Sequence, residues 1–213
     1  MDFPALARRR ISVRHYLDRP VPRERVERIL EAARWAPSGA NRQPWLFVAV
    51  GNAEAKAEIR RHCEAADERW HANAPGWMKS FFADYEILPV KEFLTTAPWL
   101  LCVFGRRGNP YWKESTWIAI AHILLGAAAE GLDSLPYTPG QTRYLNRILG
   151  VPAEFLPQAV LPLGYADPKR RPRREEHPRR PLEEVARFVE GPDFQRYEPT
   201  AEDDPPAPYG IAD

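Results

Sequence analysis

The chain of 213 residues has little cysteine and almost no net charge. Its two cysteines, Cys63 and Cys102, lie in a helical pattern and in an apolar run, so we expect buried, reduced thiols and a cytoplasmic location. The 30 basic and 29 acidic side chains leave a formal charge of +1. This balance creates no field that would attract nucleic acid or a membrane, so the expected partner is a small molecule.

Common enzyme and targeting signatures are also missing. There is no G-x-G-x-x-G, P-loop, G-x-S-x-G or C-x-x-C sequence, so a Rossmann dinucleotide domain is not indicated. No set of His, Cys and acidic residues has metal-ligand spacing, which predicts no metal site. The charged first 14 residues lack the apolar core of a signal peptide. The basic run 169–180 could bind nucleic acid, but acids and prolines interrupt it, which disfavours that role.

Long apolar runs are scarce, and the longest of them predicts a buried helix. Residues 117–132 are apolar on nearly all sides but too short and too polar to span a membrane, so we expect the central core helix there. Further elements are predicted at about 53–72 (helix), 98–104 (strand) and 156–165 (strand), with a last apolar stripe at Leu182, Val185, Phe188 and Val189. The aromatic segment 70–93 is either a core or dimer-contact cluster or the wall of a substrate pocket.

The N-terminal segment alternates charged and hydroxyl side chains with apolar ones. Arg10, Ser12 and Arg14 would share one face of an extended chain, where they could bind a phosphate or another oxyanion. The alternative is a solvated basic segment, because runs of charge usually lie on the surface.

A polar loop follows the first well-defined helix. The helix is predicted at about 22–35 from apolar residues at helical spacing: Val26, Ile29, Leu30 and Ala33. Pro37 ends this helix, because the residue before a proline leaves the helical region. Ser38, Asn41 and Gln43 then offer groups that could bind a polyhydroxyl chain or a heterocycle. An ordinary connection into the apolar run 46–50 is the simpler interpretation.

Together, these segments resemble the nitroreductase-like FMN-dependent oxidoreductases. The resemblance rests on R-x-S-x-R at 10–14, on A-P-S-x-x-N-x-Q-P-W at 36–45, and on later segments that include Leu161–Tyr165. It implies an α+β fold with a central mixed β-sheet flanked by helices, a long buried central helix and an intertwined homodimer. It also implies an FMN-binding domain at 1–190, followed by an arm or flexible tail at 191–213.

The same resemblance implies which residues bind FMN. Arg10 and Arg179 would hold the phosphate, with His177 where a lysine is common, and Ser12 would support phosphate or ribityl oxygens. Arg14 would lie near the flavin N1/O2 edge. The loop of Pro37, Ser38, Gly39 and Asn41 would come from the other subunit, so that both sites are composite. Gln43 would also bind the cofactor. The turn Pro136, Tyr137 and Thr138 would present the backbone N–H of Thr138 to N5.

The implied activity needs no catalytic side chain, because the flavin N5 carries out the redox step. Hydride would pass from a transiently docked NAD(P)H to FMN and then, in a ping-pong reaction, to a nitroaromatic, a quinone or a related acceptor. Many relatives carry glutamate or glycine near Thr138, which leaves the substrate class open. The alternatives are a flavin-destroying or dehalogenating relative and a non-catalytic flavin-binding protein.

Overall fold

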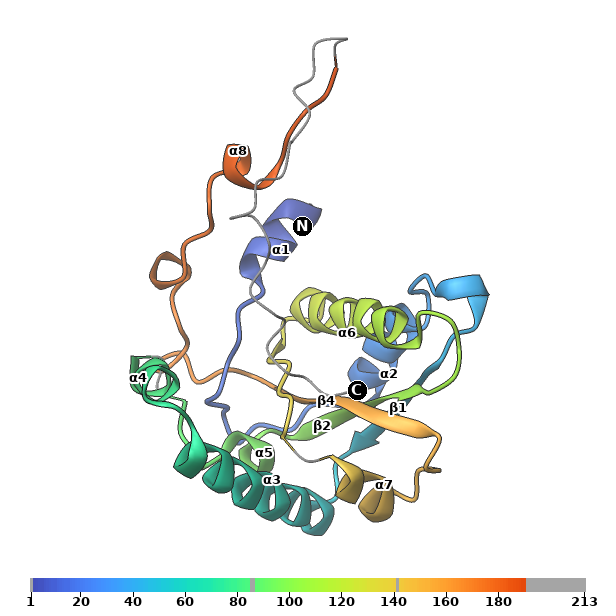
Figure 1. The fold of residues 1–213 in the computed structure, drawn as a ribbon, viewed down its shortest axis with the longest axis vertical. Helices are drawn as coiled ribbons and strands as arrows, with labels where there is room; N and C mark the ends of the chain where they lie inside the picture. The colour runs from blue at the N-terminus through green and yellow to red at the C-terminus, as the bar shows by residue number, and fades with distance from the viewer. Residues whose placement is uncertain (1, 85–86, 141, 191–213) are drawn as a thin grey trace, which may run out of the picture. The chain divides into compact units, whose positions relative to one another are not determined.

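The computed structural model describes residues 2–84, 87–140 and 142–190 (Figure 1). The chain divides into two compact units, 1–176 and 177–213, and each is described by itself. The expected C-terminal arm, 191–213, lies outside the described residues.

The first unit contains a four-stranded sheet. The strands are β1 (Trp45–Val50), β2 (Trp99–Arg106), β3 (Asp133–Ser134) and β4 (Phe155–Gly164), in the order β1-β2-β4-β3. All neighbouring pairs are antiparallel. The resemblance implies a mixed sheet. Among the described residues, the parallel pairing is limited to one bridge, between Ser12 and Ser134. Apolar runs mark strands buried on both faces, and they carry no information about strand direction.

Helices cover both faces of the sheet (Figure 1). On one face lie α2 (Arg23–Ala33) and α6 (Trp112–Ala129), and on the other α3 (Ala53–Asn73), α5 (Phe93–Thr96) and α7 (Arg143–Leu149). The other helices described in this unit are α1 (Phe3–Arg9), η1 (Gly39–Asn41), α4 (Gly76–Asp84) and η2 (Arg174–Glu176). In the second unit, α8 (Leu182–Val185) is one turn long, and the apolar stripe predicted there is solvent-exposed.

Alternation along the central strands divides the core into two clusters. Leu101 and Val103 of β2 pack with α2 and α6, whereas Leu100 and Cys102 pack with α3 and α5. Cys63 and Cys102 are both buried and unpaired, as predicted. Burial raises the pKa of the Cys63 thiol to about 11, so it is protonated at neutral pH.

Most predicted elements match the structure to within a few residues, and the central helix is the main exception at its start. The helix begins at Trp112, five residues before the predicted start at 117. Tyr111 precedes it in a left-handed conformation (φ 51°), and the polar Lys113 and Glu114 occupy its first turn. An apolar run does not mark a polar first turn, so the sequence pattern places the start of the helix too late.

Two classes of site are absent from the part of the chain that the structure describes. None of its helices is long and apolar enough to cross a membrane. Among the same residues, no three His, Cys, Asp or Glu side chains gather closely enough to hold a metal ion.

Glu130 links the C-terminal end of α6 to α2. Its carboxylate accepts hydrogen bonds from Arg28 at 2.8 and 2.9 Å and from Arg25 at 3.1 Å. The hydrogen bonds from Arg28, followed by those from Arg25, lower the pKa of Glu130 to about 2.

We expect this contact to make stability depend on pH. Because the folded-state pKa lies below the ordinary glutamate value of 4.5, the contribution is full above that pH and is lost as pH falls toward about 2. Glu130→Gln should lower the free energy of unfolding at pH 7 by about 1 kcal/mol, since the pair is partly exposed. Urea unfolding of both proteins between pH 7 and pH 2 measures the difference, and Glu154→Gln at an exposed position is the control. A deficit that stays constant over this range would contradict the assignment.

Candidate cofactor site

The segment after α1 is extended, as its alternation predicts. Ile11 and Val13 are buried in the core, at 6% and 0% exposure, whereas Arg14 is exposed. Arg10 and Ser12 are half-buried. The two arginines and the serine therefore lie on the face opposite to the core residues, which is the arrangement that an oxyanion site requires.

A parallel bridge connects this segment to the end of the sheet. Ser12 pairs with Ser134, and the backbone N–H of Val13 donates to the carbonyl oxygen of Ser134 at 3.2 Å. The Oγ of Ser134 is buried and has no protein hydrogen-bond partner. Because buried hydroxyls are normally hydrogen-bonded, this one fits a polar group bound beside the bridge.

The turn that was predicted to face flavin N5 follows this bridge directly. Tyr137 pairs with Val160 of β4 through two backbone hydrogen bonds, at 3.1 and 2.8 Å. Pro136 is half-buried and Thr138 is exposed. The structure therefore brings the 10–14 segment and the 136–138 turn to the same edge of the sheet.

The loop at 37–43 has an unusual backbone. Ala40, Asn41 and Gln43 adopt positive φ values of 49°, 52° and 45°, although none is glycine. Hydroxyl groups hold this conformation: the N–H of Gln43 donates to Ser38 Oγ at 3.0 Å, and the N–H of Gly39 donates to Ser115 Oγ at 3.1 Å. Backbone strain of this kind is concentrated at functional sites.

One chain does not bring this loop to the other two segments. The loop contacts Ser115 in the first turn of α6, whereas Arg9, next to Arg10, donates a hydrogen bond to the carbonyl oxygen of Ala128 at the opposite end. Ser115 and Ala128 are 13 residues apart on this helix, or about 20 Å at 1.5 Å per residue. Figure 1 shows α1 and the loop at opposite ends of α6.

His177 and Arg179 belong to the second unit. Both side chains are exposed, and Arg179 Nη1 donates to the carbonyl oxygens of His177 and Pro178 at 3.1 and 3.3 Å. Their role in phosphate binding stays a prediction.

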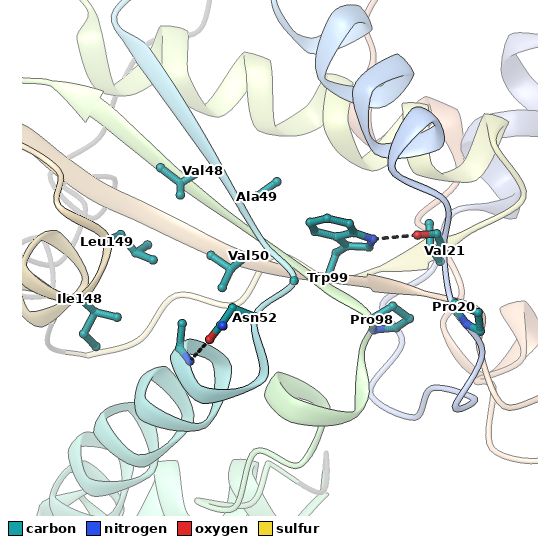
Figure 2. A pocket seen from close by; sticks show the side chains of 12 residues that line it. Pro20, Val21, Val48, Ala49, Val50, Asn52, Pro98, Trp99, Ile148 and Leu149 are labelled. Atoms are coloured by element: carbon teal, nitrogen blue, oxygen red, sulfur yellow. Dashed lines mark hydrogen bonds between the residues drawn. The ribbon is translucent and has the colours of Figure 1, made fainter.

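The apolar hollow in Figure 2 contains none of the predicted site residues. It has a volume of about 770 Å³ and lies between β1, the start of β2 and α7. Its polar side chains are already engaged: Asn52 accepts from the N–H of Ala55, and Trp99 Nε1 donates to the carbonyl oxygen of Val21. The hollow therefore lacks a free polar side chain to orient a ligand.

Comparison with known proteins agrees with this geometry. A sequence model of the Nitroreductase family matches residues 7–165. The chain belongs to the nitroreductase family. This confirms the predicted family and its α+β fold.

Three relatives of this nitroreductase-family chain are informative. It is 37% identical over 162 residues to an iodotyrosine deiodinase of Thermotoga neapolitana, covering 76% of this chain and 87% of the relative. A crystal structure of oxidized iodotyrosine deiodinase bound to FMN and 3-iodo-L-tyrosine superposes with a TM-score of 0.80 and 34% identity, covering 88% of this chain and 99% of that one. A putative NADH dehydrogenase/NAD(P)H nitroreductase of Bacteroides thetaiotaomicron has a TM-score of 0.65 and 25% identity, with 88% and 98% coverage.

The residues at the sheet edge of this family member fit FMN. Arg10, Ser12 and Arg14 supply the cations and the hydroxyl that a phosphate and an electron-rich ring edge require. The unpartnered hydroxyl of Ser134 and the turn at 136–138, in which Thr138 is exposed, lie beside them.

Sequence reasoning missed a buried polar cluster behind the turn. Asp67 of α3 forms an ion pair with Lys91 at 2.8 Å, and the two side chains are only 8% and 6% exposed. The hydroxyl of Tyr137 donates to the same carboxylate oxygen at 3.0 Å. The available signal was Asp67 itself, a charged residue next to Ala66 and one turn after Cys63 on the core-facing side of the helix.

The aromatic segment at 70–93 divides between core and surface. His71 stacks on the buried Phe82 with ring centroids 4.1 Å apart, and Trp70 packs on the same ring at 4.6 Å. Trp77 and Phe81 are 60% and 44% exposed. The core interpretation therefore holds for Phe82, whereas the rings of Trp77 and Phe81 lie largely at the surface.

We expect Gly39→Ala to disturb the strained loop. An added Cβ would meet the carbonyl oxygen of Pro110 at 2.8 Å and the Tyr111 ring at 2.9 Å, so the loop backbone has to move. Overpacking of this kind costs about 1–3 kcal/mol, and we expect FMN affinity to fall with stability. The measurements are urea unfolding and FMN titration. Gly76→Ala, where a Cβ meets nothing within 4 Å, is the control, and equal behaviour of both variants would argue against a tightly fixed loop.

Proposed function

We propose that this chain binds FMN and uses it for reductive dehalogenation of a halogenated tyrosine or a related halophenol. The similarity to iodotyrosine deiodinases, which spans most of both chains in sequence and in structure, carries the proposal. The donor set at the sheet edge supports it, because it supplies the charges that an FMN phosphate and ring would need.

Each residue has a defined role in this proposal. Arg10 and Arg179 bind the FMN phosphate, with a further contact from His177. Ser12 supports the phosphate or ribityl oxygens. The guanidinium of Arg14 stabilises the negative charge that the reduced ring carries near N1, and Thr138 directs its backbone N–H toward N5.

The proposed reaction exchanges a carbon–halogen bond for a carbon–hydrogen bond. It consumes two electrons and one proton and releases a halide ion, and bound FMN would supply the electrons. A reductant has to reload the cofactor afterwards, and NAD(P)H is the proposed source. The protein contributes binding, orientation and fixed charge, because the redox step belongs to the cofactor.

The proposed active form is a homodimer with composite sites. Within one chain, the loop at 37–43 contacts α6 about 20 Å along the helix from the carbonyl group that Arg9 contacts. This separation favours a site completed by the loop of a second copy. Large apolar side chains near this loop and on α6 are exposed, at 71% for Trp35, 71% for Tyr111 and 40% for Ile118. Exposed apolar groups of this kind are suited to burial between subunits.

The second candidate is NAD(P)H-dependent reduction of a nitroaromatic or a quinone. The fold shared with the Bacteroides protein, at 25% identity, favours it. A non-catalytic flavin-binding protein is the third candidate, and the cytoplasmic location stays a prediction.

A single experiment separates these activities. FMN bound to the protein is reduced with dithionite without oxygen and then mixed with 3-iodotyrosine, a nitroaromatic or a quinone, while flavin absorbance and released iodide are followed. We expect reoxidation by iodotyrosine with one iodide per flavin. Reoxidation only by the other acceptors would favour the second candidate, and no reoxidation by any of them, with no bleaching by NADH or NADPH, would favour the third. A protein that FMN does not titrate would refute all three.

Removing either proposed phosphate contact should weaken FMN binding. A charge-assisted hydrogen bond contributes about 1.5–3 kcal/mol, so Arg10→Ala and Arg179→Ala should each lower affinity by about 10- to 100-fold. Fluorescence titration with FMN measures the effect. The exposed neighbours give the controls Arg8→Ala and Arg180→Ala, which should bind normally. Parental affinity in both test variants would show that the phosphate lies elsewhere.

A further inference from the structure

The turn at 136–140 is held from three directions through one residue, Tyr137. Its backbone is bridged to Val160 of β4 at 2.8 and 3.1 Å. Its ring packs edge-on against Phe93, with centroids 5.6 Å apart and planes at 79°. Its hydroxyl donates to Asp67 Oδ2 at 3.0 Å. The side chain therefore points away from the exposed Thr138 and into the layer formed by α3 and α5.

The acceptor of that hydroxyl is itself fixed. Asp67 is paired with Lys91 Nζ at 2.8 Å, and Lys91 also donates its backbone N–H to Glu64 Oε1 at 2.7 Å. Glu64 and Asp67 stand one turn apart on α3, so one rigid helix anchors both contacts. Buried charges have to be paired, and a hydrogen bond to an ionised carboxylate is stronger than a neutral one.

We propose that Tyr137 and Asp67 are positioning residues that hold the Thr138 backbone N–H in place for the cofactor. The proposal rests on the proposed FMN site. A donor that serves a reacting atom has to be held to within about 0.5 Å, and a displacement of about 1 Å can cost up to 100-fold in rate. Within the described part of the chain, the Thr138 side chain forms no comparable hydrogen bond of its own. A Cβ on Gly140, two residues later, would meet nothing within 4 Å.

The flavin redox potential reports this position directly. N5 accepts a hydrogen bond in the oxidised ring but carries a proton in the reduced ring, so a fixed N–H donor there favours the oxidised form. Loosening the donor should raise the midpoint potential and slow the transfer of hydride to N5.

The decisive variant is Tyr137→Phe, which removes only the hydroxyl. Tyr144→Phe is the matched control, because the hydroxyl of Tyr144 forms a hydrogen bond with Cys63 Sγ at 2.9 Å in the same buried region. Dye-coupled redox titration of the FMN-loaded proteins should show a midpoint potential about 30 mV higher in Tyr137→Phe only. This shift corresponds to a tenfold change in the ratio of oxidised to reduced FMN. Flavin reduction by NAD(P)H, which transfers hydride to N5, should slow by about tenfold in the same variant.

A second variant keeps the proposal testable if the first fails to fold. Asp67→Asn retains an oxygen acceptor but removes its charge, so it should give a smaller shift in the same direction. The double variant should match Tyr137→Phe alone, because position 67 acts on the turn through that hydroxyl.

Two results would overturn the proposal. Lower thermal stability with unchanged potential and rate would leave the Tyr137–Asp67 contact a purely structural one. A higher KM for iodotyrosine in Asp67→Asn with unchanged potential would assign the carboxylate to substrate binding. The potential is measured without substrate, so it tests the positioning role even if the unmodified protein proves inactive on iodotyrosine.

Discussion

Burial of β2 and β4 between two helical layers is the constraint on which the rest of this structure depends. Both strands have apolar side chains on both faces, so each face requires a cover. Placing α2 and α6 on one side and α3, α5 and α7 on the other satisfies that requirement. The candidate site forms at the β3 edge of the sheet, where the 10–14 segment and the 136–138 turn pair with the sheet through single bridges.

The length of α6 then determines how the site can be completed. The helix packs one face into the core, from Ser115 to Ala128, so it cannot be shortened without opening the core. It therefore keeps the loop at 37–43 far from Arg10 within one chain. In the proposed dimer, the loop of a second copy would complete the site of the first. In this arrangement FMN affinity would depend on association as well as on local contacts.

Local patterns predicted the elements well, and their spatial relations poorly. The alternation at 10–14 predicts an extended chain, and the helical spacing at about 22–35 predicts a helix. Each depends on one local repeat of buried side chains, and both agree with the structure. The antiparallel order of the sheet depends on contacts between distant segments, which no local period records. The Asp67–Lys91 pair was missed for the same reason, because its members are 24 residues apart and Asp67 looks like an ordinary surface acid until its neighbours are known.

The two parts of the candidate site are held by different physical means, and this difference suits their proposed tasks. The 37–43 loop depends on hydroxyl groups that satisfy a strained backbone, with left-handed residues of the kind that cost about 1–3 kcal/mol each. Such a loop keeps its shape only while Ser38 and Ser115 remain in place, so it can present a fixed surface to a partner. The 136–138 turn depends instead on buried charge behind Tyr137. Because buried charge pairs tolerate little displacement, this side can maintain the finer tolerance that an atom next to N5 requires.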